Sequence, residues 1–409
     1  MTTRLLRDTL RRFGELIAVT VRPPRDGYRQ PGPGHYLLGL ALLPLLTLFL
    51  AYHWLGLLLD ELLFRGYRRV SIDQPVFILG VPRSGTTALH HTLARDPQFT
   101  TMRTWECLFG LSVTWRLCGR AIARFDRWLG RPLGWILQRV ERRLARGLQS
   151  VHPTGLDLPE EDYWTLLPVL GCFGLVAAFP DARSLWRIAR FDHALPPAER
   201  ERLMAFYRSC LQRHLYVHGD DRRLLTKNAA FAQAAASLLR AFPDARVICC
   251  LRDPAGAVPS QVSALDPALR ALHGSYRRTG IRDRMLALLA DHYRDLLDVL
   301  PERAPGRAVF LPAAALHRAP AASVAECYRW LALPLDPEFV AALQRIPPGT
   351  GPSAPATERR LRAVGLSAAA LDERFAAIRA RFDFAARAPT PAWAVGDLRP
   401  PASPLAPAA

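Results

Sequence analysis

Short apolar runs alternate along the middle of the chain with longer stretches in which apolar residues recur every three or four positions. Short runs bounded by turn residues predict buried strands, and the three-to-four spacing predicts helices. We expect strands at 75–80, 223–226, 245–251 and 308–311, and helices at 84–95, 197–217, 229–241 and 322–332. This alternation predicts an α/β domain over residues 71–385, with a mainly parallel β-sheet flanked by helices on both faces.

Two stretches depart from the alternation. Residues 107–220 contain no run that predicts a strand, so we expect a helical insertion into the α/β domain. Residues 386–409 are rich in alanine and proline, and this composition predicts a disordered tail.

The first 70 residues have the pattern of a membrane-associating segment. Residues 1–29 interleave arginines with apolar residues, which predicts a basic amphipathic helix. After a Gly/Pro break, an uncharged run of 24 residues extends from Tyr36 to Leu59. It is long enough to cross the roughly 30 Å hydrocarbon core of a bilayer. It starts too late and is too long for a secretory signal.

Three placements of this apolar run stay open. Basic residues flank it on both sides, so a single crossing leaves one basic flank outside the cell, against the positive-inside rule. Pro44 lies in the middle of the run, where a proline kinks a helix. We favour most a segment that dips into one leaflet, next a true crossing, and least an apolar helix packed on the soluble domain.

The charge balance adds a second hint of an anionic partner. The formal net charge is +18, and Lys227 is the only lysine among 54 basic residues. Such an excess predicts a basic surface, a membrane face or a phosphorylated ligand. No nucleic-acid partner is expected, because no zinc finger or aromatic RNA-binding motif is visible. The seven cysteines lack CxxC and zinc spacings, which favours a reducing compartment over a disulfide framework.

The strongest motif is PVFILGVPRSGTTALHHTL, residues 75–93. An apolar strand runs into Gly80, a turn follows, and a helix begins near Ser84, so that backbone N–H groups and the helix dipole form an anion site. The spacing matches the Walker A pattern, but Thr86 stands at the lysine position and the positive side chain lies earlier, at Arg83. This suits an anion with less charge beyond its first phosphate.

PRSGTT after an apolar strand resembles the 5′-phosphosulfate loop of sulfotransferases that use 3′-phosphoadenosine 5′-phosphosulfate (PAPS). Among these enzymes the sequence most resembles the bacterial sulfotransferase family, over about residues 55–385. The resemblance implies a P-loop-type sheet, PAPS as the donor and no metal. It also implies that the 5′ end of PAPS is held by Arg83, Ser84, Gly85, Thr86 and Thr87.

A second motif is ARVICCLRDPAGAVPSQVSAL, residues 245–265. Arg252 ends an apolar strand, and Ser260 follows eight residues later. The resemblance implies that these two residues bind the 3′-phosphate of the cofactor. A guanidinium offers bidentate contacts to a phosphate, and a hydroxyl adds one donor. Arginines 359, 360 and 362 form a late basic segment that could reach the same phosphate.

The catalytic residues are expected to include Arg83 and Lys227, the latter at the end of a predicted strand. The resemblance implies that Lys227 contacts the sulfuryl or leaving-group oxygen. Relatives often place a histidine shortly after this lysine, but Asn228 follows it here. Glu106 is our first candidate for the proton acceptor, although a structural ion pair would explain it too. His152 and the acidic run 160–162 are second candidates, and His90 and His91 are expected to pack.

We therefore expect an enzyme that transfers a sulfuryl group from PAPS to a hydroxyl, or less readily an amine, of a small-molecule or lipid-linked acceptor. The catalytic domain should lie on the cytoplasmic side of a membrane surface, because PAPS is made in the cytosol. Two alternatives stay open, a P-loop ATP-dependent kinase and a non-catalytic membrane-associated protein that kept the fold. The sequence does not identify the acceptor or the oligomeric state.

Overall fold

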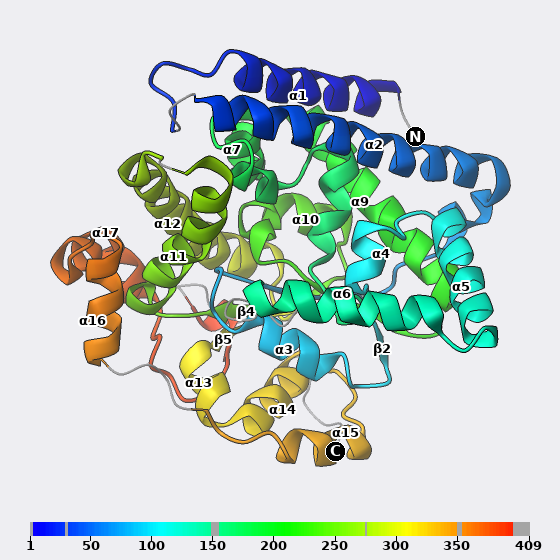
Figure 1. Cartoon of the computed structure of the whole chain (residues 1–409). Coiled ribbons are helices and arrows are strands. Elements are labelled where there is room, and N and C mark those ends of the chain that lie inside the picture. Colours follow the sequence, from blue (N-terminus) through cyan, green and yellow to red (C-terminus); the bar gives the residue numbers. More distant parts are fainter. Residues whose placement is uncertain (1–2, 29–31, 149–154, 275, 350–353, 396–409) are drawn as a thin grey trace.

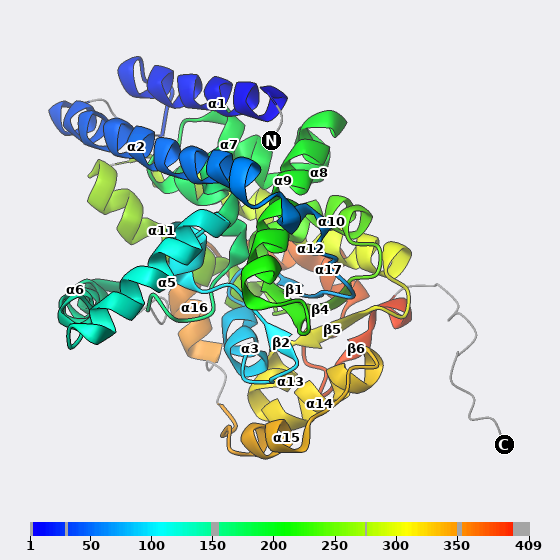
Figure 2. The same cartoon turned by 90° about the vertical axis from the view of Figure 1, so that its right-hand side faces the viewer.

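The computed structural model describes residues 3–28, 32–148, 155–274, 276–349 and 354–395. A six-stranded sheet lies at its centre, in the order β2-β3-β1-β4-β5-β6 (Figure 2). The strands are β1 Val76–Gly80, β2 Phe99–Thr100, β3 Arg223–Lys227, β4 Arg246–Leu251, β5 Ala308–Pro312 and β6 Thr390–Pro391. All neighbouring strands run parallel except β5 and β6, which confirms the expected α/β fold with a mostly parallel sheet.

The central strands are continuous apolar runs because helices cover both faces of the sheet. Phe77 and Leu79 of β1 point into one core and Val76 and Ile78 into another. The first core includes α9, α10 and α12, and the second includes α3 and α14 (Figures 1 and 2). A side chain at Gly80 would lie 2.2 Å from the carbonyl oxygen of Cys250, so only glycine lets β1 leave the sheet this close to β4.

The helices around the sheet follow the strands in sequence. They are α3 Thr86–Leu93, η4 Ala229–Ala234, α10 Ala235–Ala241, α11 Pro254–His273, α12 Arg278–Arg303, α13 Ala313–Arg318, α14 Pro320–Trp330, α15 Pro337–Gln344, α16 Ala354–Ala363, α17 Ala368–Arg381 and η5 Ala392–Ala394. The helix expected at 229–241 is thus divided into a 3-10 turn and an α-helix.

The described residues between 107 and 220 form helices and turns without a strand. The elements of this region, with α4 just before it, are α4 Thr104–Leu108, α5 Val113–Trp128, α6 Pro132–Leu148, η2 Asp162–Val169, η3 Phe173–Ala177, α7 Arg183–Ala189, α8 Phe191–Ala194 and α9 Pro197–His218. The helices α5 and α6 form a hairpin that projects from the body of the molecule (Figure 2).

The prediction of a disordered tail from residue 386 was wrong for its first part. Strand β6 pairs with Val309 and Phe310 of β5, and Ala392 and Val395 are buried. Trp393 packs edge-on against Trp330, with ring centroids 6.1 Å apart. A few apolar side chains are enough to order a segment whose composition otherwise resembles a tail. Residues 396–409 lie outside the described residues.

The N-terminal segment is part of the same body. Helices α1 (Thr3–Val21) and α2 (Pro33–Leu63) lie side by side across one end of the molecule, followed by the turn η1 (Arg65–Arg69) (Figures 1 and 2). Leu5, Leu16 and Leu57 belong to the same core cluster as Phe77 of the sheet. Because of this shared core, the predicted boundary at residue 70 does not separate two packed units.

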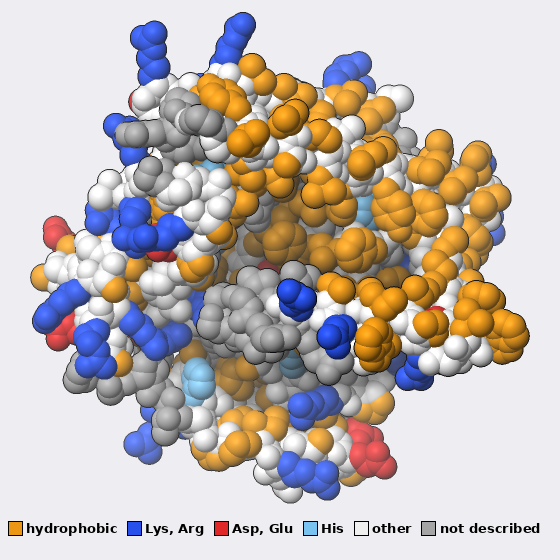
Figure 3. All heavy atoms as spheres, viewed as in Figure 1, with side chains coloured by type: hydrophobic (Ala, Val, Ile, Leu, Met, Phe, Trp, Pro, Cys, Tyr) orange, Lys and Arg blue, Asp and Glu red, His pale blue; other side chains and the backbone are white. Residues whose placement is uncertain are grey.

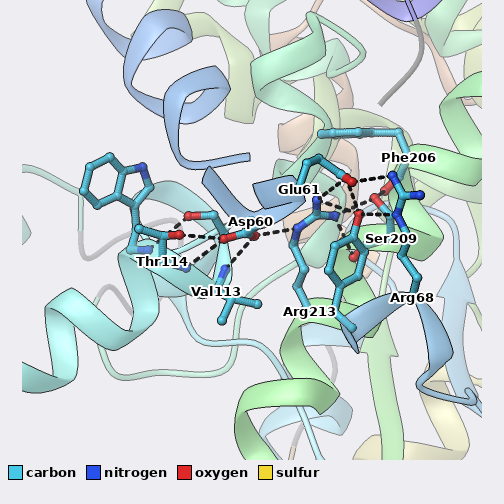
Figure 4. Close-up of polar contacts among 11 residues, drawn as sticks. Asp60, Glu61, Arg68, Val113, Thr114, Phe206, Ser209 and Arg213 are labelled. Atoms are coloured by element: carbon cyan, nitrogen blue, oxygen red, sulfur yellow. Dashed lines mark hydrogen bonds and ion pairs between the residues drawn. The ribbon is translucent and has the colours of Figure 1, made fainter. Parts of the chain in front are cut away.

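Buried charges fix α2 to the domain at its C-terminal end (Figure 4). The carboxylate of Asp60 accepts hydrogen bonds from the backbone N–H groups of Val113 and Thr114, both at 2.9 Å. Its Oδ2 also pairs with Nε of Arg213 at 2.8 Å, and both side chains are almost fully buried. Among the described residues, the segment Gly34–Leu63 is the one helix long and apolar enough to cross a membrane.

Candidate active site

A cavity of about 780 Å³ lies where β1, β3 and β4 end. At one end it is polar, lined by residues of the loop after β1 and by Arg252. At the other end it is apolar, lined among others by Trp164, Phe173, Phe191 and Leu288. The cavity can therefore hold an anionic ligand at one end and an apolar ligand at the other.

The loop between β1 and α3 has the geometry of an anion-binding turn. Arg83 has a positive φ of 69° and Gly85 one of 93°, so the chain turns sharply before α3 begins at Thr86. The buried hydroxyl of Ser84 donates to the carbonyl oxygen of Val81 at 2.7 Å. That hydrogen bond holds the loop closed, so the Ser84 hydroxyl already has a partner within the loop.

The structure brings the two predicted motifs together. Nε of Arg83 donates to the hydroxyl of Ser260 at 3.1 Å, and Nη1 of Arg252 donates to the carbonyl oxygen of Arg83 at 3.1 Å. Parallel strands β1 and β4 are neighbours, so their carboxyl ends carry Arg83 and Arg252 to one edge of the sheet.

Positive charges converge around Arg252. Burial lowers the pKa of Arg252, and the nearby guanidiniums of Arg360 and Arg83 lower it further. Arg360 comes from α16, in the late basic segment, whereas Arg362 forms an ion pair with Glu358. Mutually repelling guanidiniums around a cavity favour a ligand with strong negative charge.

Sequence reasoning missed Gly256, which makes room for Arg252. A Cβ at this position would lie 2.7 Å from Nε of Arg252. The absence of a side chain lets the guanidinium lie across the first turn of α11. The signal was present in the sequence, because the glycine follows RDP at the start of a predicted helix, but only the packing explains it.

Lys227 occupies the junction of the phosphate loop and the acidic run. Its side chain is almost fully buried at the end of β3, and Nζ donates to the hydroxyl of Thr87 at 3.1 Å. Nζ also forms an ion pair with Glu161, which lines the cavity beside Glu160. An ammonium and a carboxylate therefore lie together next to the predicted 5′ end of the cofactor.

The structure contradicts the choice of Glu106 as the proton acceptor. Its side chain is 1% exposed and is absent from the described lining of the cavity. One carboxylate oxygen caps the N–H of Arg103 at 3.0 Å, and the other accepts from His218 at 2.7 Å. Burial opposes the charge of Glu106, but His214 and Arg116 outweigh it and hold its pKa well below the usual value.

Glu106, His214 and His218 also place three potential metal ligands within 4.8 Å of one another. The sequence spacing did not reveal this cluster. The buried guanidinium of Arg116 lies 3.1 Å from the shared carboxylate oxygen. This cation already supplies the positive charge that a metal ion would bring, so the cluster fits a structural ion pair better than a metal site.

Asp162 and Asn228 tie the acidic run to β3. The buried carboxylate of Asp162 accepts hydrogen bonds from the hydroxyl of Tyr207 at 2.9 Å and from the Asn228 amide. The Asn228 side-chain oxygen accepts from the N–H of Tyr163 at 2.8 Å. Burial raises the pKa of Asp162 to about 7. The residue after Lys227 thus positions the segment that carries Glu161.

The histidines near the cavity differ in whether they are buried or line it. His90 is buried and hydrogen-bonded to the Thr101 hydroxyl at 2.8 Å, as expected for packing, whereas His91 lines the cavity. His152 lies outside the described residues. His292 of α12 also lines the cavity and was not anticipated, because α12 carries no motif and reaches the site only through the tertiary fold.

Comparison with known proteins identifies the family of the chain. The sulfotransferase family matches residues 75–337. The ω-hydroxy-β-dihydromenaquinone-9 sulfotransferases Stf3 of Mycobacterium bovis and Mycobacterium tuberculosis are 27% identical over 233 residues, which are 56% of this chain and 54% of theirs. The chain thus spans about half the length of the curated relatives it matches.

Two crystal structures share the fold. The sulfotransferase STF9 of Mycobacterium avium superposes with a TM-score of 0.67 at 19% identity, covering 94% of this chain and 97% of that one. STF1 of M. tuberculosis gives a TM-score of 0.63 at 17% identity, with 90% and 92% covered. The family match extends over more than half of the chain and includes both predicted motifs. The chain belongs to the sulfotransferase family.

Proposed function

We propose that this protein transfers a sulfuryl group from PAPS to a hydroxyl of an amphiphilic acceptor. The observation that carries the proposal is the meeting of Arg83 and Arg252 at the polar end of a cavity whose other end is apolar, with Ser260 bound to Arg83. Family membership supports sulfuryl transfer and the PAPS donor.

Different residues at the polar end of the cavity would bind the two ends of the nucleotide. The loop N–H groups from Arg83 to Thr87, with the hydroxyls of Thr86 and Thr87, would bind the 5′-phosphosulfate. Arg252 and Ser260 would bind the 3′-phosphate, with Arg360 adding positive charge. The Arg83–Ser260 hydrogen bond would give way so that both side chains face the ligand.

Glu161 would take up the proton of the acceptor, and Lys227 would stabilise the charge of the leaving group. Glu161 would accept the proton of the acceptor hydroxyl as the acceptor oxygen attacks sulfur. The bond from sulfur to the bridging phosphate oxygen would break, and Lys227 would stabilise the negative charge on that oxygen. Adenosine 3′,5′-bisphosphate and the sulfated acceptor would be the products. The Lys227–Glu161 ion pair supports these roles because it holds both side chains beside the loop.

The apolar end of the cavity indicates the class of acceptor. Aromatic and aliphatic side chains favour an acceptor with a large apolar part and a hydroxyl that reaches Glu161. The curated relatives are named for a hydroxylated menaquinone, an acceptor of this amphiphilic type. The cytoplasmic side of a membrane would supply both such a lipid and the PAPS made in the cytosol.

The test is a transfer assay with purified full-length protein, PAPS and long-chain alcohols or hydroxylated quinones in detergent micelles. The proposal predicts formation of adenosine 3′,5′-bisphosphate and a sulfated product in equal amounts. Magnesium-dependent turnover of ATP instead would favour the kinase alternative. Tight nucleotide binding without transfer to any acceptor would favour the non-catalytic alternative.

A further inference from the structure

Helices α5 and α6 present their apolar sides to solvent. Both are strongly amphipathic, and an amphipathic helix of a soluble domain normally buries its apolar side. Here Trp128 is 77% exposed and Trp135 58% exposed. Among the side chains of this hairpin that the structure describes, the other large exposed apolar ones are Leu117, Ile122, Phe125, Leu129, Leu133, Ile136, Leu137 and Val140.

The exposed side of α2 continues this surface. Its large exposed apolar residues include Leu40, Leu45, Leu48, Leu55, Leu58 and Leu62. Figure 3 shows these groups gathered on one side of the molecule, around a hollow between α2 and α6. We call the exposed apolar residues of α2, α5 and α6 the apolar face. Its extent exceeds the scattered single residues found on most soluble surfaces.

The charges beside the apolar face are basic. Where side chains are described, the exposed charged residues of α5, α6 and the turn between them are arginines 120, 124, 127, 131, 139 and 143. A helix with aromatic and aliphatic residues on one side and arginines on the other is typical of the interface of an anionic bilayer. A second copy of the chain fits less well, because a symmetric contact would bring like-charged rows together.

The fold argues against a helix that spans the bilayer. To cross it, α2 would have to leave Arg213, whose guanidinium would then stay buried without its partner Asp60 (Figure 4). Removing one member of a buried ion pair is strongly unfavourable. Helix α2 also holds the cavity wall, since Nε1 of Trp54 donates to the carbonyl oxygen of Pro168 in η2 at 2.9 Å. The helix therefore lies along the surface of the domain.

We propose that the apolar face docks the protein on an anionic lipid bilayer, with α2, α5 and α6 parallel to its surface. The hollow between α2 and α6 would then face the lipid. The consequence for the acceptor rests on the proposed function. A membrane-borne alcohol would enter the apolar end of the cavity directly from the leaflet, while PAPS would enter from water.

The test uses co-sedimentation of the full-length protein with phosphatidylcholine vesicles, with and without phosphatidylglycerol. We expect binding to the anionic vesicles that weakens as salt is raised. The triple substitution Phe125→Ser, Trp128→Ser and Trp135→Ser should weaken the partition coefficient by at least about 100-fold, since three large apolar side chains leave the lipid.

A matched pair of leucine variants controls for general effects. Leu133→Ser changes a leucine of the apolar face that is 46% exposed, and Leu335→Ser changes one that is 37% exposed and lies just before α15. Helix α15 lies at the opposite end of the molecule from α2 (Figures 1 and 2). Leu133→Ser should weaken vesicle binding by about tenfold, and Leu335→Ser should leave it unchanged.

Three outcomes would overturn the proposal. They are no vesicle binding by the wild-type protein, equal binding by the triple variant, or a dimer in ultracentrifugation that the triple variant abolishes while vesicles are not bound. Calorimetry with adenosine 3′,5′-bisphosphate keeps this test apart from that of the proposed function. Vesicle binding without nucleotide binding would leave the docking intact and reject the enzyme.

Discussion

The ion pair of Glu161 with Lys227 replaces Glu106 as the centre of the proposed chemistry. We expect Glu161→Gln to lower turnover by about 100-fold or more, because an amide cannot accept the acceptor proton. Affinity for adenosine 3′,5′-bisphosphate, measured by calorimetry, should stay near the wild-type value. The control is Glu160→Gln, the neighbouring acid that also lines the cavity. Equal losses in both variants would contradict a specific role for Glu161.

Asp162 makes the stability of the protein depend on pH. Its pKa is raised to about 7 by burial, so the folded state holds this proton more tightly than the unfolded chain does. The contribution of Asp162 is therefore favourable at low pH and is lost as the pH rises through about 7. Wild-type protein should lose about 3 kcal/mol of unfolding free energy relative to Asp162→Asn between about pH 5 and about pH 7, with little further change up to about pH 8.

Urea unfolding of both proteins across this range measures that difference. The comparison with Asp162→Asn cancels the titration of all other groups, provided that the variant folds. A difference that stays constant with pH would contradict the raised pKa.

At the residue scale, the sequence predicted that residues of two separate motifs would lie close together. Arg83 and Arg252 both follow strand ends, and the structure brings them together with Ser260. Their roles in binding are implied by the resemblance and stay predictions. Glu106 was misjudged because its partners Arg116, His214 and His218 come from α5 and α9, and no sequence spacing shows that they converge on one carboxylate.

Among the elements, α2 is fixed at its C-terminal end by the buried ion pair of Asp60 with Arg213. Asp60→Asn should lower the unfolding free energy by about 3 kcal/mol, because Arg213 would keep a buried charge with a weakened partner. The control is Glu358→Gln, which removes the exposed pair with Arg362 and should cost less than about 1 kcal/mol. Chemical unfolding followed by circular dichroism checks both. Similar losses for the two variants would show that Asp60 does not anchor α2.

The elements were predicted unevenly for physical reasons. Strands β1, β4 and β5 are largely apolar runs of five or six residues, and their signal is clear. Strand β3 has the sequence RLLTK, with only two apolar residues, so its signal is weaker. Strands β2 and β6 have two residues each, too few to show any period. The 3-10 turns η2 and η3 form part of the cavity wall. They have no amphipathic pattern of their own, and α2 packs against η2 and α11 against η3.

For the whole molecule, an apolar run cannot by itself tell a spanning helix from one packed on a domain. Buried polar residues of α2, among them His53 and Asp60, are visible in the sequence, but their partners are not. The apolar face likewise follows from exposure, which depends on which side of α5 and α6 meets the body. Only the assembled fold brings the exposed apolar residues of α2, α5 and α6 to one side of the molecule (Figure 3).

The central claim is that the converging arginines bind a nucleotide with phosphates at both ends. Calorimetry with adenosine 3′,5′-bisphosphate, compared with ATP and magnesium, tests it without knowledge of the acceptor. We predict binding of the bisphosphate in preference to ATP. Arg252→Ala should weaken that binding by about 1.5–3 kcal/mol, the range for a hydrogen bond to a charged group. The control Arg329→Ala, which changes an arginine paired with Glu326 on α14, should bind as the wild type does. Preference for ATP, or unchanged affinity in Arg252→Ala, would contradict the account.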